Sequence, residues 1–144
     1  MSSTISTFTT NWVKVKFPSF IEEHVDRLNE KAECLPGGSV FTVDHYKGQI
    51  RVTAYDVIDQ GLGYYEDEDE EEGWIDLEDE IIEGLIEGEV LRLTTLSWFK
   101  GRLESMEVSV TTWDGRRESR SSRELHAEIA QKLEIDQKQL GGWN

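Results

Sequence analysis

Apolar and polar residues alternate between positions 12 and 17. Val13, Val15 and Phe17 fall on one side of this stretch, and more polar residues fall on the other. A period of two is typical of a strand with one buried face. The pattern therefore predicts a half-buried strand over 12–17, ended by Pro18.

Three stretches have the apolar spacing of a helix. The first runs from a capping residue at Ser19 to the Pro-Gly-Gly of 36–38, and the second runs from an Asp76 N-cap to Gly88. The third begins with a capping box at Ser121. The three stripes are Ile21, Val25, Leu28, Ala32 and Leu35; Leu77, Ile81, Ile82, Leu85 and Ile86; and Leu125, Ile129 and Leu133.

Two other segments predict β-hairpins. Residues 39–58 are rich in β-branched and aromatic side chains and contain turn residues at Lys47-Gly48. Residues 90–113 have the same character, with the turn around Lys100-Gly101-Arg102. Asp114-Gly115 marks one more turn.

The order of these elements, βαββαββα, predicts the α+β class, with an antiparallel-rich sheet and helices on one face. Two descriptions fit this order. In the first, a ferredoxin-like βαββαβ core carries an added strand and helix. In the second, a βαββ unit is duplicated, because Tyr46-Lys47-Gly48 is echoed by Phe99-Lys100-Gly101.

The length of 144 residues favours a single domain. We place it at 11–140, with an acidic loop at 61–73. The Ser/Thr-rich residues 1–10 are expected to be a flexible tail, and 141–144 a short C-terminal tail.

The negative charge of the chain is confined to one interval. The formal net charge is −15, and 16 of the 30 acidic residues lie between Arg51 and Arg92, where there is no Lys or Arg. The remaining 14 acids are balanced by 15 Lys and Arg. Charge that is localised in this way indicates a local role more than general solubility.

Known catalytic patterns are absent from the sequence. There is no nucleotide-binding motif or nucleophile elbow, and the one local acid–base set, around His45, has neighbours that point to opposite faces of a strand. The single cysteine, Cys34, lies at a helix C-terminus, which does not activate a thiol. A calcium loop starting at Glu68 would end on Asp79, where a Glu is needed. We expect no catalytic residue, no metal and no cofactor.

A basic cluster precedes the last predicted helix. It contains Arg116, Arg117, Arg120 and Arg123, and we expect a loop whose arginines pair with acids elsewhere. Direct binding of nucleic acid through these arginines is disfavoured, because the acidic interval would repel the phosphates.

The acidic interval has aromatic flanks and continues into a predicted helix, so it is the candidate partner-binding surface. Positions 76, 79, 80, 83 and 87 would share one side of that helix. The candidate residues are Tyr64, Tyr65, Glu66, Asp67, Glu68, Asp69, Glu70, Glu71, Glu72, Trp74, Asp76, Asp79, Glu80, Glu83 and Glu87.

These features predict a cytoplasmic, non-enzymatic interaction module that binds a basic protein surface. In size, acidity and charge clustering, the chain is similar to small acidic inhibitors of nucleic-acid-binding proteins, of the anti-restriction, anti-CRISPR or immunity type. The alternative is a structural or assembly subunit of a phage or bacterial complex, in which the acidic loop only maintains solubility. No apolar run reaches the length of a membrane span.

Overall fold

Antiparallel strands form the centre of the protein. A computed structural model describes residues 4–33, 40–57, 62–65 and 74–134. Six strands make one sheet in the order β2-β3-β1-β6-β7-β8, and β4 and β5 pair separately. The strands are β1 (Ile5–Thr10), β2 (Val40–Tyr46), β3 (Gln49–Val57), β4 (Gly63–Tyr65), β5 (Trp74–Asp76), β6 (Val90–Phe99), β7 (Arg102–Thr112) and β8 (Arg117–Ser121).

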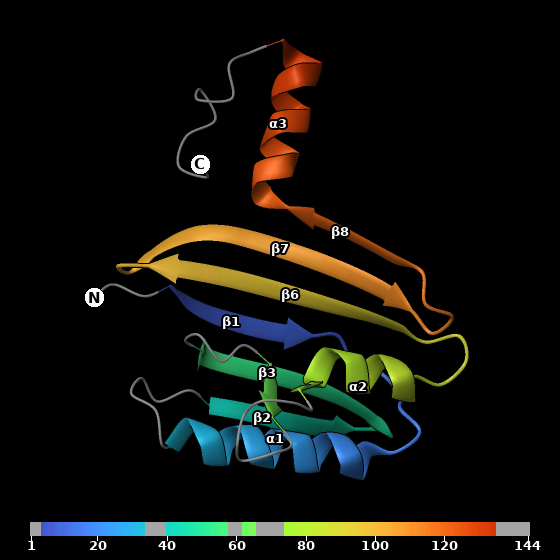
Figure 1. Ribbon diagram of the computed structural model, residues 1–144. Helices are drawn as coiled ribbons and strands as arrows, with labels where there is room; N and C mark the ends of the chain where they lie inside the picture. The colour runs from blue at the N-terminus through green and yellow to red at the C-terminus, as the bar shows by residue number, and fades with distance from the viewer. Residues whose placement is uncertain (1–3, 34–39, 58–61, 66–73, 135–144) are drawn as a thin grey trace.

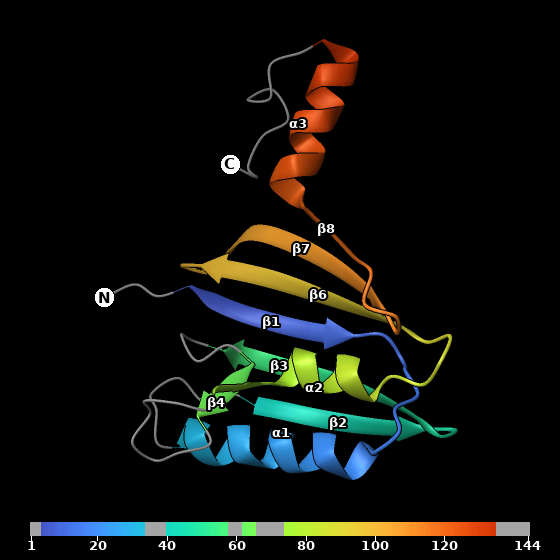
Figure 2. The same cartoon turned by 45° about the vertical axis from the view of Figure 1, so that its right-hand side comes forward.

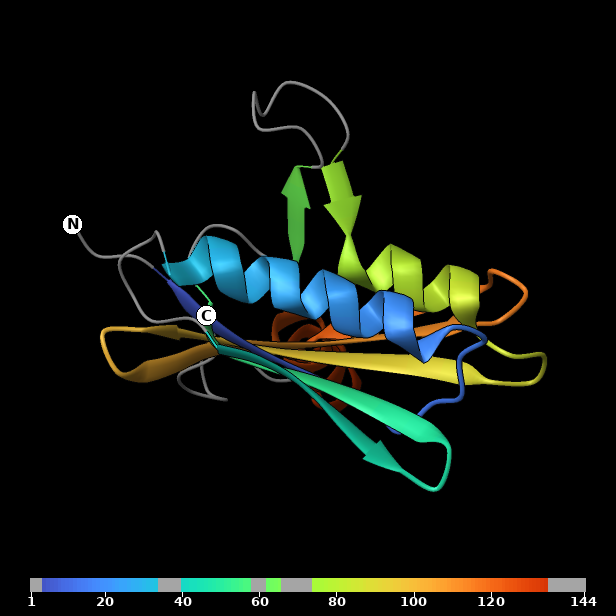
Figure 3. The ribbon, with the colours of Figure 1, turned by 90° about the horizontal axis from the view of Figure 1, so that it is seen from below.

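The helices are α1 (Pro18–Glu33), α2 (Leu77–Gly84) and α3 (Ser122–Leu133). α1 and α2 lie side by side on one face of the sheet (Figure 3). α3 extends away from the sheet beyond β8, as two views show (Figures 1 and 2). The α+β class with an antiparallel sheet is therefore confirmed, and two of the helices share a face.

The sheet order matches the ferredoxin-like description. β1, α1, β2, β3, α2 and β6 follow one another as βαββαβ, interrupted only by the β4–β5 pair. β3 lies between β1 and β2 in the sheet, and every neighbouring pair is antiparallel. This arrangement is the split βαβ topology. β7 and β8 extend it on the β6 side.

The N-terminal tail was predicted wrongly, because Ile5–Thr10 forms β1 near the middle of the sheet. Thr and Ile are β-branched and suit a pleated sheet despite their polar neighbours. Thr10 is buried, and its hydroxyl accepts a hydrogen bond from the Val52 amide at 3.0 Å. A buried hydroxyl with such a partner costs little, so a Thr-rich strand can occupy a central position.

The strand predicted over 12–17 is reduced to two isolated bridges. Val13 pairs with Ile50, and Val15 pairs with Leu85. Both valines are buried as the alternation predicts, whereas Phe17 is 58% exposed. This segment therefore links β3 to the end of α2 instead of forming a full strand.

One hydrophobic core lies between the sheet and the two helices that cover it. Ile21, Val25 and Leu28 of α1 are buried, as their spacing predicts. They pack with buried side chains of β3 and α2, among them Ile50 and Ile81. The Ala32 and Leu35 side chains of the predicted stripe lie outside the described part of the chain. This core fixes α1 against α2 and so shapes the surface between them.

α2 ends earlier than its apolar pattern predicts. The helix stops at Gly84, and Leu85 leaves it with an extended backbone (φ −59°, ψ 134°). The amide of Lys16 donates to the Gly84 carbonyl at 2.7 Å, so the segment before α1 satisfies a carbonyl at the end of the helix. Gly88, the predicted stop, lies in a turn with φ 89°.

Candidate functional site

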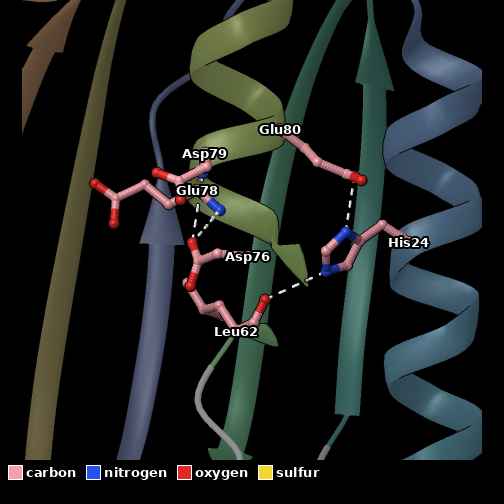
Figure 4. Close-up of polar contacts among 6 residues, drawn as sticks. All are labelled: His24, Leu62, Asp76, Glu78, Asp79 and Glu80. Carbon is pink, nitrogen blue, oxygen red and sulfur yellow. Dashed lines mark hydrogen bonds and ion pairs between the residues drawn. The ribbon is translucent and has the colours of Figure 1, made fainter. Parts of the chain in front are cut away.

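α2 begins at a capped acidic turn. The Asp76 carboxylate accepts hydrogen bonds from the amides of Glu78 (2.9 Å) and Asp79 (3.4 Å), as its predicted N-cap role requires (Figure 4). The first turn also carries Glu80. Carboxylates near a helix N-terminus are stabilised by the helix dipole, which offsets part of their mutual repulsion. The sequence can therefore concentrate acids here without losing the helix.

The predicted acidic side of this helix is only partly formed. Asp79 and Glu83 are exposed on α2, and Glu87 is exposed in the turn that follows it. Asp76 uses its carboxylate as the cap, and Glu80 contacts His24. The prediction that five acids share one side of the helix is therefore wrong, because α2 ends at Gly84 and two of the acids have structural partners. We call Asp79 and Glu83, together with Glu87 of the following turn, the acidic side of α2.

His24 joins α1 to α2 from a buried position. It is 1% exposed. Its ring Nδ1 lies 2.7 Å from Glu80 Oε2, and its Nε2 lies 3.3 Å from the carbonyl oxygen of Leu62 (Figure 4). Both partners offer acceptor oxygens to the ring nitrogens, so the two contacts hold the imidazole between α2 and the residue that precedes β4.

A histidine is a polar residue type expected on the solvent side of α1, but His24 lies in the core. His24 falls three residues after Ile21 and four before Leu28, so it lies within the buried stripe. The spacing signal was present in the sequence. Its carboxylate partner comes from a helix 56 residues further along the chain, which no local pattern indicates.

A groove lies between α1 and α2. It has a volume of about 430 Å³, which is in the size range of ligand sites. Val15 and Ile21 contribute apolar walls. We call it the α1–α2 groove, and its other principal side chains are Phe17, Phe20, Glu23, His24, Glu80 and Glu83.

Two exposed aromatic rings stand at this groove. Phe17 and Phe20 are 58% and 57% exposed, and their ring centroids are 5.3 Å apart. Neighbouring exposed rings next to carboxylates form a surface with both apolar area and charge, as in protein-binding sites. Phe20 and Glu23 line the groove but were not among the predicted partner-binding residues. The available signal was that Phe20 precedes the buried stripe by one residue and so lies off it.

The β4–β5 pair brings the two ends of the acidic run together. Tyr65 is opposite Trp74 in the register. The two strands project from the helix-bearing side of the sheet (Figure 3). Residues 66–72, which hold the seven consecutive acids, and the side chains of Tyr64 and Tyr65 lie outside the described part of the chain.

Trp74 packs closely over a glycine. A Cβ added at Gly63 would be 2.3 Å from the Trp74 ring, which is shorter than a van der Waals contact allows. The ring is still 49% exposed. The absence of a side chain at Gly63 therefore lets the indole lie close against β4 while about half of the residue stays exposed.

Glu78 turns away from the acidic side of α2, toward β8. Its Oε1 lies 3.2 Å from Arg117 Nη2, and its side chain is only 15% exposed. The contact is an ion pair without hydrogen-bond geometry. Burial raises the pKa of Glu78 above its ordinary 4.5, while the nearby Arg117 charge opposes that rise.

The raised pKa of Glu78 leads us to expect a specific pH dependence of the free energy of unfolding. The Glu78 carboxyl loses its proton near pH 4.5 in the unfolded state and at higher pH in the folded state, so its contribution to stability should fall as pH rises from 4.5 toward neutrality. Glu78→Gln should remove this part of the pH dependence. Urea unfolding of both proteins at a series of pH values measures it. Parallel curves for the two proteins would contradict the expectation.

The basic cluster was predicted as a loop, and this is wrong for most of it. Arg117 and Arg120 belong to β8, the edge strand. The expected pairing with distant acids is found for Arg117 and Glu78, whereas Arg120 lies 3.7 Å from both Glu118 and Glu128. These arginines lie in a strand because residues 117–121 pair with β7, in a register that includes Thr111↔Arg117.

The surface histidine that was weighed for acid–base chemistry has an exposed partner. His45 Nε2 contacts the carboxylate of Glu22, and Asp44 instead pairs with Arg51 at 3.1 Å. Both side chains of the His45 pair are about half exposed. Among the described residues, no group of three or more His, Cys, Asp or Glu is placed to hold a metal ion.

None of the described helices is long and apolar enough to cross a membrane. Comparison of the chain with protein-family models, with characterised proteins and with solved structures finds no match.

Proposed function

We propose that the protein is an interaction module that binds a basic protein surface through the acidic side of α2 and the neighbouring groove. The observation that supports this most strongly is the coincidence of exposed carboxylates with exposed aromatic rings. Glu83 belongs to the acidic side of α2 and also lines the groove that holds Phe17 and Phe20. Aromatic rings supply contact area, and charges steer the encounter.

The local charge supports this proposal further. No Lys or Arg lies between Arg51 and Arg92, so no cation of that interval neutralises the exposed acids. The β4–β5 pair, which holds the ends of the acidic run, lies on the same side of the sheet as α2 (Figure 3). All the Lys, Arg, Asp and Glu side chains that this interval offers to a basic partner are negative.

We further propose that the partner is a nucleic-acid-binding protein and that this protein inhibits it. A protein that binds duplex DNA accepts a dense row of charges, about one per 1.7 Å of helix axis. The sequence has seven consecutive acids followed by Asp79 and Glu83 of α2, which is a high density of negative charge along a short stretch of chain. Occupation of the partner's basic site would then exclude the nucleic acid.

Charge reversal of the acidic side of α2 tests the proposal. The variant Asp79→Lys, Glu83→Lys and Glu87→Lys changes three exposed residues and leaves the Asp76 cap and the Glu80–His24 contact in place. The wild-type protein and the variant would each be used to capture proteins from a cell lysate at low and high salt, and the captured proteins would be compared by quantitative mass spectrometry. We expect at least about a tenfold loss of the salt-sensitive partners, since close charge pairs at interfaces contribute more than about 1.4 kcal/mol.

A matched variant controls for net charge. Glu104→Lys, Glu118→Lys and Glu134→Lys make the same change of charge at exposed positions on β7, on β8 and just after α3, and they leave Arg120 its contact with Glu128. This variant should retain the partners. Equal loss with both variants would show that total charge, and not the α2 surface, controls capture. Both variants must keep the wild-type circular dichroism spectrum.

The position of α3 favours a second candidate function, an assembly subunit. α3 extends beyond β8 (Figure 1), and Leu133 at its end is 62% exposed. An apolar side chain at the end of a projecting helix suits contact with another subunit. This function predicts that charge reversal on α2, and deletion of 66–72, both leave the partners bound.

A further inference from the structure

We propose that the α1–α2 groove is a binding pocket for one arginine side chain of the partner. The inference rests on the proposed function and deepens it by naming the group that is recognised. It starts from the composition of the groove, which combines apolar walls, two aromatic rings and carboxylates in about 430 Å³. A long side chain with an apolar stem and a cationic head matches this combination.

The aromatic rings offer an apolar surface to the aliphatic stem of an arginine and a stacking surface to its planar guanidinium. Phe17 and Phe20 are tilted by 40° with centroids 5.3 Å apart, and more than half of each residue is exposed. Val15 and Ile21 extend this apolar surface into the groove. A cation within about 6 Å of an aromatic ring centroid is attracted by the quadrupole of the ring, and the attraction is stronger where water is excluded.

Carboxylates from both helices provide the negative charge. Glu23 comes from α1 and Glu83 from α2, and both are exposed. Glu80 is already in contact with His24 at 2.7 Å, so its carboxylate has a partner within the protein. Glu23 and Glu83 therefore leave the groove with an uncompensated negative charge among its lining residues, and a cation would neutralise it.

The chemistry favours arginine over lysine. A guanidinium is planar, stacks on aromatic rings and offers five donors to more than one carboxylate. An ammonium is a compact, strongly hydrated charge that stacks poorly. Since the groove has two rings and carboxylates on two different helices, it suits a flat, branched donor better than a point charge.

Three short peptides test this proposal by NMR. The probes are acetyl-Gly-Arg-Gly-amide, the same peptide with lysine, and the same peptide with citrulline, which is the uncharged isostere of arginine. Each would be titrated into the full-length, ¹⁵N-labelled protein to millimolar concentration. We expect the arginine peptide to shift amides of 15–24 and 80–84, with lysine at least about threefold weaker and citrulline weaker still.

Two groove variants and one control locate the binding. Phe17→Leu keeps an exposed apolar side chain but removes an aromatic face, and Glu83→Gln removes one charge. Both should reduce the shifts caused by the arginine peptide. Glu104→Gln removes an exposed charge on β7 and should not change them.

Several outcomes would overturn the proposal. The proposal fails if the arginine peptide causes no amide shifts, or if the lysine or the citrulline peptide causes shifts as large as those of the arginine peptide. It also fails if the shifts are confined to the amides of 66–72, or if they persist in both groove variants. The proposed function fails separately, when charge reversal on α2 leaves partner capture intact. Loss of capture on charge reversal, together with an unresponsive groove, would retain the acidic interaction module and reject the arginine pocket.

Discussion

Leu28→Ala should lower the free energy of unfolding by about 3–5 kcal/mol, the range measured for leucines truncated in rigid cores. Leu28 is 0% exposed and belongs to the core between α1, β3 and α2. The other side chains of this core come from both helices and from β2, β3 and β6, so the cavity cannot close easily. A typical domain has about 5–15 kcal/mol of stability, and this loss is a large part of it.

Urea unfolding followed by circular dichroism measures this loss, with the slope against urea unchanged if the folded state keeps its shape. Arg27→Ala is the matched control, because Arg27 is the exposed neighbour on the same helix. Its cost should stay within about 0.5 kcal/mol. A Leu28→Ala loss below about 1 kcal/mol would contradict the close packing of α1 on the sheet.

The contact between His24 and Glu80 should be strongly cooperative. Glu80→Leu leaves the buried imidazole without its carboxylate, and a buried polar group that loses its partner costs about 1–3 kcal/mol. The double variant His24→Leu/Glu80→Leu removes both groups and should recover most of that loss, because replacing a buried pair by apolar side chains is often neutral. Thermal and urea unfolding of the three proteins give the coupling energy.

Glu83→Leu is the control for the Glu80 variant. Glu83 lies three residues further along α2 and is exposed, so the same substitution should change stability by no more than about 0.5 kcal/mol. Additive losses in the double variant would show that the two side chains act independently. Because Glu80 also lines the α1–α2 groove, the pair determines how firmly the walls of the groove are held.

The turns of the two hairpins could be predicted because their chemistry is local. Lys47 and Gly48 have φ of 50° and 77°, and Lys100 and Gly101 have φ of 51° and 77°. Two successive positive φ values are what a two-residue hairpin loop needs, and glycine adopts them without strain. The capping box at Ser121 is also local, and both of its hydrogen bonds with Glu124 are present.

The parts that were missed depend on contacts between distant residues. β1 has a composition typical of a tail, and only pairing with β3 and β6 makes it a central strand. β8 was taken for a loop because its charges suggested solvent and its partner is β7. Sequence patterns report the burial of one element at a time and do not show which elements meet.

The candidate site was predictable in charge but not in shape. The interval without Lys or Arg indicated where negative charge would gather. The end of α2 at Gly84 involves a hydrogen bond from Lys16, and the half-buried Glu80 contacts His24 of another helix. The groove exists only because α1 packs beside α2, so its aromatic rings could not be assigned to it in advance.

The two borders of the sheet limit how another chain can join it. Along β8, Arg117, Glu118 and Arg120 place exposed charges on both faces of the edge. At β2, the Asn29 side chain forms hydrogen bonds with both the amide and the carbonyl of Phe41, at 2.9 Å each. Charged or covered edges discourage pairing with a foreign backbone. Recognition of this protein should therefore proceed through side chains on its faces, and the sheet should resist growth by β-augmentation or fibril formation.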